Sequence, residues 1–84
     1  MKLYLISQTI NNDWDTFEAA VVCAPSELTA QNMNPDSGEP MTDGDWQNRF
    51  PSWCSSPKEV TVKYIGEATD GIKQGVVLAS FKAG

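Results

Sequence analysis

The sequence predicts an α+β fold, a four-stranded antiparallel sheet of ββαββ order with one helix packed on the sheet and a long irregular loop. Three observations predict this class. Two apolar segments near the N-terminus flank a polar turn, a helix-start signal follows them, and two segments of alternating polarity end the chain. The length of 84 residues corresponds to a single domain, residues 1–84.

The first two strands are predicted on either side of a turn rich in Asn and Asp. Lys2–Ser7 is a short apolar run with large side chains on both faces, as a central strand requires. Residues 8–15 contain Asn11, Asn12 and Asp13, whose side chains bond to nearby backbone, so they are typical of a hairpin loop. Thr16–Ala24 then forms a strand with two faces: Phe17, Ala19, Val21 and Cys23 on one, and Glu18, Ala20, Val22 and Ala24 on the other.

A short helix is predicted after the second strand. Pro25, Ser26 and Glu27 supply a helix-compatible proline, a capping hydroxyl and an acid near the positive end of the helix dipole. The helix should end near Met33, because Pro35 disfavours helical geometry in the residue before it.

Residues 34–57 contain four prolines and two glycines, which predicts a long irregular segment. Within it, Trp46, Phe50 and Trp53 are spaced i, i+4 and i+7. This spacing predicts one helical turn, capped by Asp43 or Asp45 and stopped by a proline.

Two strands are predicted at the end of the chain, as a second hairpin around Thr69-Asp70-Gly71. Residues 59–68 and 75–83 both alternate in polarity. In the first of these strands, Val60, Val62 and Tyr64 share one face and Thr61, Lys63 and Ile65 the other; in the second, Val77, Ala79 and Phe81 oppose Val76, Leu78 and Ser80.

The composition excludes several classes of function. The chain has no histidine, no glycine-rich phosphate loop and no zinc-ligand spacing of its two cysteines, so we expect neither an enzyme nor a bound metal or cofactor. Asn11, Asp13 and Asp15 alternate like calcium ligands but lack the later glycine and glutamate, which favours a solvated turn. Cys23 reads as a packed thiol, whereas Cys54 could be reactive or bridging.

Charge and hydropathy indicate the environment. No apolar run approaches the length of a membrane span or a secretory signal, so we expect a cytoplasmic protein without membrane contact. A formal charge of −5 argues against direct binding to duplex nucleic acid. Residues 1–48 hold one cation and eight carboxylates, a net −7, whereas residues 49–84 hold five cations and three carboxylates, a net +2.

This asymmetry has two interpretations, solubility or an acidic face that docks on a basic groove of a partner. Large rings beside cations in the same segment could stack on bases, fill pockets of a partner or simply cap the sheet core, and Trp14 could pack across the first hairpin. The predicted partner-binding residues are Asp36, Glu39, Asp43, Asp45, Trp46, Arg49, Phe50 and Trp53.

The chain resembles a group of small proteins encoded by bacteriophages and prophages. The matching segments cover both predicted hairpins: residues 1–8 (MKLYLISQ), 12–17 (NDWDTF), 20–22 (AVV), 65–68 (IGEA) and 75–84 (GVVLASFKAG). The resemblance implies a phage accessory protein made in the cytoplasm of an infected bacterium, and small acidic proteins of this kind are often antagonists of host defence, including anti-CRISPR proteins.

The leading hypothesis is therefore a non-enzymatic inhibitor that binds a host defence protein or effector complex through the acidic and aromatic residues. The alternative from another class is a sponge for a nucleotide immune signal, with Trp46, Trp53, Arg49 and Lys58 forming the pocket across the interface of a homo-oligomer such as a homodimer. A minor virion or assembly protein is the third possibility.

Overall fold

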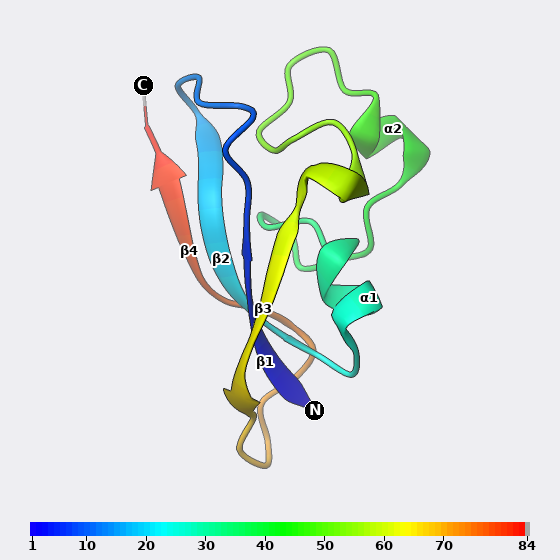
Figure 1. Ribbon diagram of the computed structural model, residues 1–84, viewed down its shortest axis with the longest axis vertical. Helices are drawn as coiled ribbons and strands as arrows, with labels where there is room; N and C mark the ends of the chain where they lie inside the picture. Colours follow the sequence, from blue (N-terminus) through cyan, green and yellow to red (C-terminus); the bar gives the residue numbers. More distant parts are fainter. Residues whose placement is uncertain (84) are drawn as a thin grey trace.

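The computed structural model describes residues 1–83. Gly84, which ends both the predicted domain and the segment 75–84 that resembles phage proteins, lies outside the described residues. Four strands form one antiparallel sheet in the order β3-β1-β2-β4, which confirms the predicted α+β class (Figure 1). The elements in chain order are β1 Lys2–Ser7, β2 Thr16–Ala24, α1 Glu27–Gln31, α2 Asp43–Trp46, the 3-10 turn η1 Pro57–Glu59, β3 Thr61–Glu67 and β4 Gly75–Lys82.

The predicted second hairpin is wrong. β3 pairs with β1 and β4 pairs with β2, so the last two strands lie on opposite edges of the sheet (Figure 1). Their connection, residues 68–74, crosses the end of the sheet near the N-terminus, where the Ala68 N–H donates to the Met1 carbonyl at 3.0 Å. The turn signal at residues 69–71 marks a reversal of the chain, but a reversal does not choose the partner of the strand that follows.

The first hairpin is confirmed, with register from Lys2 opposite Ala24 to Ser7 opposite Ala19. Its loop is held by the buried side chain of Gln8. The Gln8 amide donates to the carbonyls of Phe17 at 2.9 Å and Asn11 at 2.8 Å. Its oxygen accepts from the Asn11 N–H at 2.7 Å, so one polar residue satisfies both sides of the hairpin end.

A β-bulge changes the predicted faces of β2. The register with β4 shifts between Phe17 and Ala19, so Glu18 is an extra residue in the ladder. Phe17 therefore joins Ala20 on the buried face instead of sharing a face with Ala19.

A second bulge changes the predicted faces of β4. Val76 pairs with Val22 and Leu78 pairs with Val21, which leaves Val77 as the inserted residue. Val76 and Ala79 both pack against the core, so the predicted grouping of Val76 with Leu78 is wrong.

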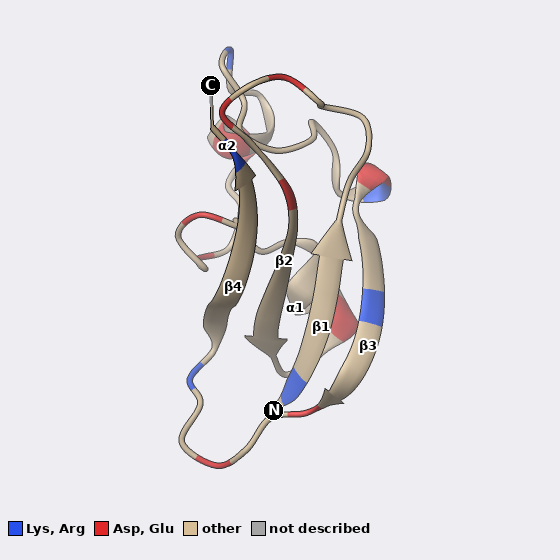
Figure 2. Cartoon of the chain, turned by 90° about the vertical axis from the view of Figure 1, so that its left-hand side faces the viewer, with Lys and Arg blue, Asp and Glu red and all other residues tan. Residues whose placement is uncertain are grey.

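The molecule has two layers, because only one face of the sheet is covered. Figures 1 and 2 show the helices and the irregular segment on one side of the sheet, with the other side open. The predicted face of Val60, Val62 and Tyr64 is confirmed, since Val60 and Val62 pack against the core and the Tyr4 and Tyr64 rings meet edge to face at 5.9 Å. The register of β3 with β1 shifts after Tyr64, however, so Ile65 is an inserted residue that breaks the predicted alternation. The core between the layers consists of Tyr4, Ile6, Phe17, Ala20, Val22, Ala24, Ala30, Met33, Trp53, Cys54 and Val60.

The covering layer begins as predicted and then departs from the prediction. Ser26 caps α1, accepting from the Thr29 N–H at 3.3 Å. α2 is capped by Thr42 and not by an aspartate. It ends at Trp46, so Phe50 and Trp53 lie beyond it and the predicted helical turn across all three rings is wrong.

Candidate functional site

Two loops form an open cleft at the end of the molecule opposite the N-terminus. One is the hairpin loop between β1 and β2, and the other is the segment that follows α2. Figure 2 shows the two loops together at this end, with acidic positions on the hairpin loop and a basic position on the other. The cleft has a volume of about 310 Å³ and is lined by Asp13, Trp14, Asp15, Arg49, Phe50 and Pro51.

Hydrogen bonds across 40 residues of sequence hold the walls of the cleft together. The Asn11 side-chain amide, on the hairpin loop, donates to the carbonyls of Pro51 at 3.2 Å and Trp53 at 3.1 Å. The Phe17 N–H donates to the Ser52 carbonyl at 2.8 Å. Trp53 is 2% exposed and anchors the second loop in the core. The cleft is therefore a fixed feature of the fold and not a gap between two independent loops.

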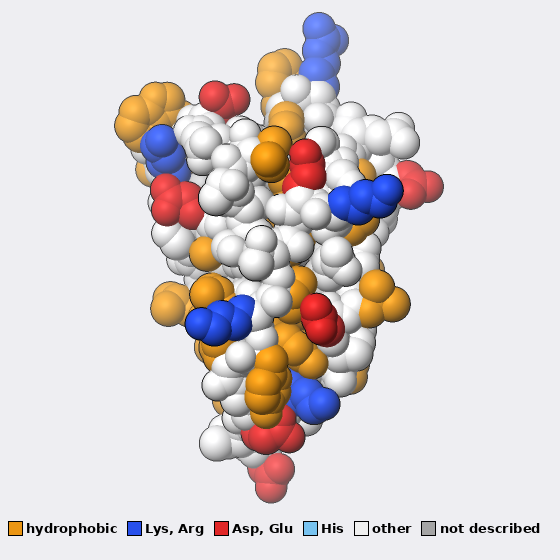
Figure 3. All heavy atoms as spheres, in the orientation of Figure 1, with side chains coloured by type: hydrophobic (Ala, Val, Ile, Leu, Met, Phe, Trp, Pro, Cys, Tyr) orange, Lys and Arg blue, Asp and Glu red, His pale blue; other side chains and the backbone are white. Residues whose placement is uncertain are grey.

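Each wall presents a large aromatic ring to solvent. Trp14 is 67% exposed and Phe50 is 83% exposed. Lys82 Nζ lies 4.9 Å from the centre of the Trp14 ring, and Arg49 Cζ lies 6.0 Å from that of Phe50. At the upper end of the face in Figure 3, hydrophobic side chains accordingly stand beside basic ones. Trp and Arg are the residue types that most often carry the binding energy of protein interfaces.

The charges at the cleft have both signs. Asp13 and Asp15 line it together with Arg49. The Lys82 ammonium donates to the Asn12 carbonyl at 3.0 Å, so its position over the indole is fixed by a second contact. Two carboxylates and two cations suit a partner surface that carries charges of both signs better than they suit a multiply charged anion.

Of the eight residues predicted to bind a partner, Arg49 and Phe50 lie at this cleft. Trp53 is buried, so its prediction as an exposed anchor is wrong. It fills the space between the sheet and the irregular segment, where its indole replaces apolar contacts that the two short helices are too small to supply. Trp46 is partly buried and packs against the same core, which makes it mainly a structural residue.

The two aspartates of α2 differ in role, since one caps the helix and the other is exposed to solvent. The Asp45 carboxylate accepts from the Thr42 N–H at 2.9 Å while the Thr42 hydroxyl accepts from the Asp45 N–H at 3.1 Å, a reciprocal capping box. Asp45 also lines a polar hollow of about 30 Å³ that shares Pro51 with the aromatic cleft. Asp43 is exposed in the first turn of the helix.

Asp36 and Glu39 belong to a separate tight turn. The Asn34 side chain accepts from the Asp36 N–H at 2.9 Å, and the Gly38 N–H donates to the Asn34 carbonyl at 2.8 Å. Gly38 has a φ of +77° and lies so close to β4 that a Cβ there would be 3.1 Å from the Gly75 Cα. The predicted carboxylates are thus divided between a turn beside β4 and a helix, and acidic side chains on the upper part of the face in Figure 3 are interspersed with basic ones.

The nucleotide pocket predicted across a homo-oligomer interface stays a prediction, and the burial of Trp53 removes one of its four residues from the surface of this chain. Its four residues include Trp53, which is sealed in the core, and Lys58, which lies in η1. Within the described part of the chain, the two most exposed aromatic rings are Phe50 and Trp14, ahead of Tyr64 and Phe81.

Sequence reasoning missed Trp14 and Asn11. Trp14 was expected to pack across the first hairpin, but its ring is exposed and contacts Lys82 of β4. Asn11 was assigned to a solvated turn, but its side chain joins the two loops. The available signal for Trp14 was its position between two aspartates, because a buried indole is rarely flanked by charges on both sides.

The fold places both cysteine side chains in the interior. Both are free and buried, which confirms Cys23 as a packed residue and makes Cys54 a core residue as well. Burial raises the pKa of the Cys54 thiol above its usual value, so the nucleophilic thiolate is disfavoured. Within residues 1–83, no group of three or more acidic or cysteine side chains could hold a metal ion.

Comparison with protein-family models, with characterised proteins and with solved structures found no match to this chain. The resemblance to small phage proteins therefore remains a prediction. No helix within the described part of the chain is long and apolar enough to cross a bilayer.

Proposed function

We propose that this chain is a non-enzymatic binding protein that recognises a protein partner through the Trp14–Phe50 cleft. One observation carries the proposal: two large rings stand exposed on opposite walls of a cleft whose walls are fixed to each other by hydrogen bonds. Exposed rings held in place can enter a partner's pockets with little further loss of conformational entropy.

The charges favour a protein over a nucleotide as the ligand. A nucleotide would bring its phosphates next to Asp13 and Asp15, and the two cations at the cleft, Arg49 and Lys82, already lie against the Phe50 and Trp14 rings. A protein surface can place a Lys or Arg against these carboxylates and apolar groups against the rings. The net charge of −5 would also steer the chain toward a basic surface.

The resemblance to phage proteins directs the choice of partner. On that basis, the partner is a protein of a bacterial defence system, such as a CRISPR effector, and the chain acts as its inhibitor in the host cytoplasm. Nucleic-acid-binding effectors carry basic grooves, and their positive charge is complementary to the net negative charge of this chain.

The test is affinity capture from bacterial lysates containing different defence systems, followed by binding measurements with the purified partner. Trp14→Ala and Phe50→Ala should each weaken binding by about 30-fold, the equivalent of a hot-spot loss of about 2 kcal/mol. Leu28→Ala is the matched control, because Leu28 is 69% exposed on α1, away from the cleft.

Two outcomes would overturn the proposal. A partner that binds Trp14→Ala and wild type equally would not use the cleft. Loss of binding in an Asp36→Asn, Asp43→Asn double variant, with Trp14→Ala unaffected, would instead place recognition on the acidic segment. Asp45 is left intact in this test because its carboxylate caps α2.

Calorimetric titration with cyclic nucleotides should give no heat. Nucleotide binding that Trp14→Ala abolishes would instead support the nucleotide sponge.

A further inference from the structure

One buried polar side-chain atom has no hydrogen-bond partner among the described residues 1–83, the indole Nε1 of Trp53. The Trp53 side chain is 2% exposed, so its N–H is removed from bulk water. An indole N–H can only donate, and a buried donor without an acceptor costs free energy because it has lost its bonds to water. The Trp53 N–H therefore requires an acceptor that residues 1–83 do not supply directly.

Trp53 lines the polar hollow of about 30 Å³ that lies beside α2. Four other residues of the lining have side chains that carry oxygen atoms: Asn34, Asp45, Asn48 and Ser52. We propose that this hollow is a binding site for a water molecule, which accepts from the Trp53 N–H and donates to an oxygen of the lining. This inference is independent of the proposed function.

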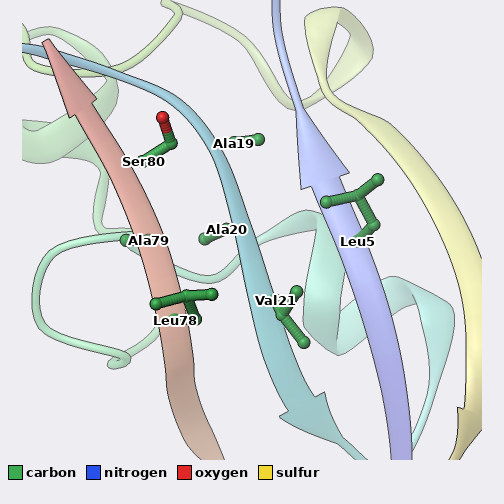
Figure 4. A pocket seen from close by; sticks show the side chains of 7 residues that line it. All are labelled: Leu5, Ala19, Ala20, Val21, Leu78, Ala79 and Ser80. Atoms are coloured by element: carbon green, nitrogen blue, oxygen red, sulfur yellow. The ribbon is translucent and has the colours of Figure 1, made fainter.

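The polar lining distinguishes this hollow from the larger one on the open face of the sheet. The larger hollow, of about 310 Å³, is lined by aliphatic side chains and one hydroxyl, and Figure 4 shows Leu5, Val21 and Leu78 around it. Such a lining offers a water molecule little to bond to, because a buried water makes about two to four hydrogen bonds. The hollow at Trp53 supplies polar partners, and its volume exceeds the roughly 10–15 Å³ that a bound water needs.

The charges around the hollow select a neutral ligand. A ligand that accepts from the Trp53 N–H meets the positive end of that bond, which disfavours a metal ion or an ammonium group. The Asp45 carboxylate disfavours an anion such as chloride or phosphate. Water is a neutral ligand that can accept from the indole and donate to carboxylate and amide oxygens at the same time.

Two oxygens of the lining are held in place by their own segment of the chain. The Asp45 carboxylate accepts from the Thr42 N–H at 2.9 Å, and the Asn48 side chain accepts from the Phe50 N–H at 3.0 Å. Each oxygen has a second lone pair, but turning the side chain toward the indole would break the bond that it already makes. A bound water therefore satisfies the Trp53 N–H while the capping box of α2 stays intact.

The experiment is NMR detection of water contacts in the 15N-labelled full chain, which has three tryptophans. A bound water gives cross peaks of opposite sign in nuclear Overhauser spectra recorded in the laboratory and rotating frames, whereas proton exchange with water gives the same sign in both. The Trp53 indole proton should show the opposite signs. Trp14 is the internal control: its ring is 67% exposed, so its indole proton should show no contact with long-lived water.

A variant and a second measurement guard against a false signal. A hydroxyl proton that exchanges with water can mimic a bound water, and Ser52→Ala removes the hydroxyl of the lining; the cross peak should persist in this variant. A crystal structure should show a water oxygen about 2.7–3.2 Å from Trp53 Nε1. A cross peak that is absent from wild type, or lost in Ser52→Ala, would overturn the inference. A crystal structure in which Trp53 Nε1 donates directly to Asp45 or Asn48 would overturn it as well.

Discussion

The Asn11 side chain is the most direct link between the two loops of the cleft, and its removal has a calculable cost. Asn11→Ala deletes the bonds to the Pro51 and Trp53 carbonyls and the bond that its oxygen accepts from the Asp13 N–H at 3.2 Å. A net contribution of about 0.5–1.5 kcal/mol for each of the two long-range bonds predicts a loss of about 1–3 kcal/mol of unfolding free energy. For a domain of this size, that corresponds to a fall in melting temperature of roughly 4–24 °C.

The assay is urea unfolding followed by tryptophan fluorescence. The control is Asn12→Ala, because the neighbouring asparagine side chain makes one exposed local bond, to the Thr9 carbonyl at 3.0 Å. Its effect should stay within about 0.5 kcal/mol. Asn11→Ala should also weaken partner binding although its side chain does not line the cleft. Equal stability of the two variants would refute the conclusion that Asn11 holds the loops together.

The remaining predictions concern the backbone at two glycines and the burial of Cys54. Gly38→Ala should lower the free energy of unfolding by about 2–4 kcal/mol in a denaturant titration, because φ is +77° and the new Cβ would lie 3.1 Å from the Gly75 Cα. Gly44→Ala in α2 should instead raise the free energy of unfolding by up to about 1 kcal/mol. A Gly38→Ala variant as stable as wild type would contradict the close approach of Gly38 to β4. Native Cys54 should resist alkylation until the protein unfolds. Burial raises the pKa of the Cys54 thiol in the folded state, so the protonated thiol stabilises the fold at pH values below the ordinary pKa of a thiol, and this stabilisation is lost as the pH rises through the raised pKa. A Cys54→Ser variant whose stability falls in alkali as steeply as that of wild type would contradict this reasoning.

The sequence predicted elements whose signals are local. The hairpin loop of residues 8–15 and the Ser26 cap depend on side chains that bond to their own neighbourhood, and both are present. The bulges at Glu18, Ile65 and Val77 were missed, because each arises from how two strands match in length and twist and not from either strand alone. The edge chosen by β4 was missed for a related reason: a turn does not encode a pairing.

The candidate site was predicted in part. Arg49 and Phe50 were named, but Phe50 and Trp53 could not be distinguished from sequence, because both are aromatic residues in one irregular segment. Which of them enters the core depends on how the segment crosses the sheet, and the bonds from Asn11 and Phe17 determine that path. Trp14 joins the site only because the fold brings residues about 35 positions apart to the same cleft.

Hydrogen–deuterium exchange on the purified complex tests the central claim most directly, since it maps the contact without any substitution. The account predicts slower exchange in residues 12–15 and 47–52 on partner binding, with α1 unchanged. Slower exchange confined to residues 34–45, with both walls of the cleft unaffected, would contradict it.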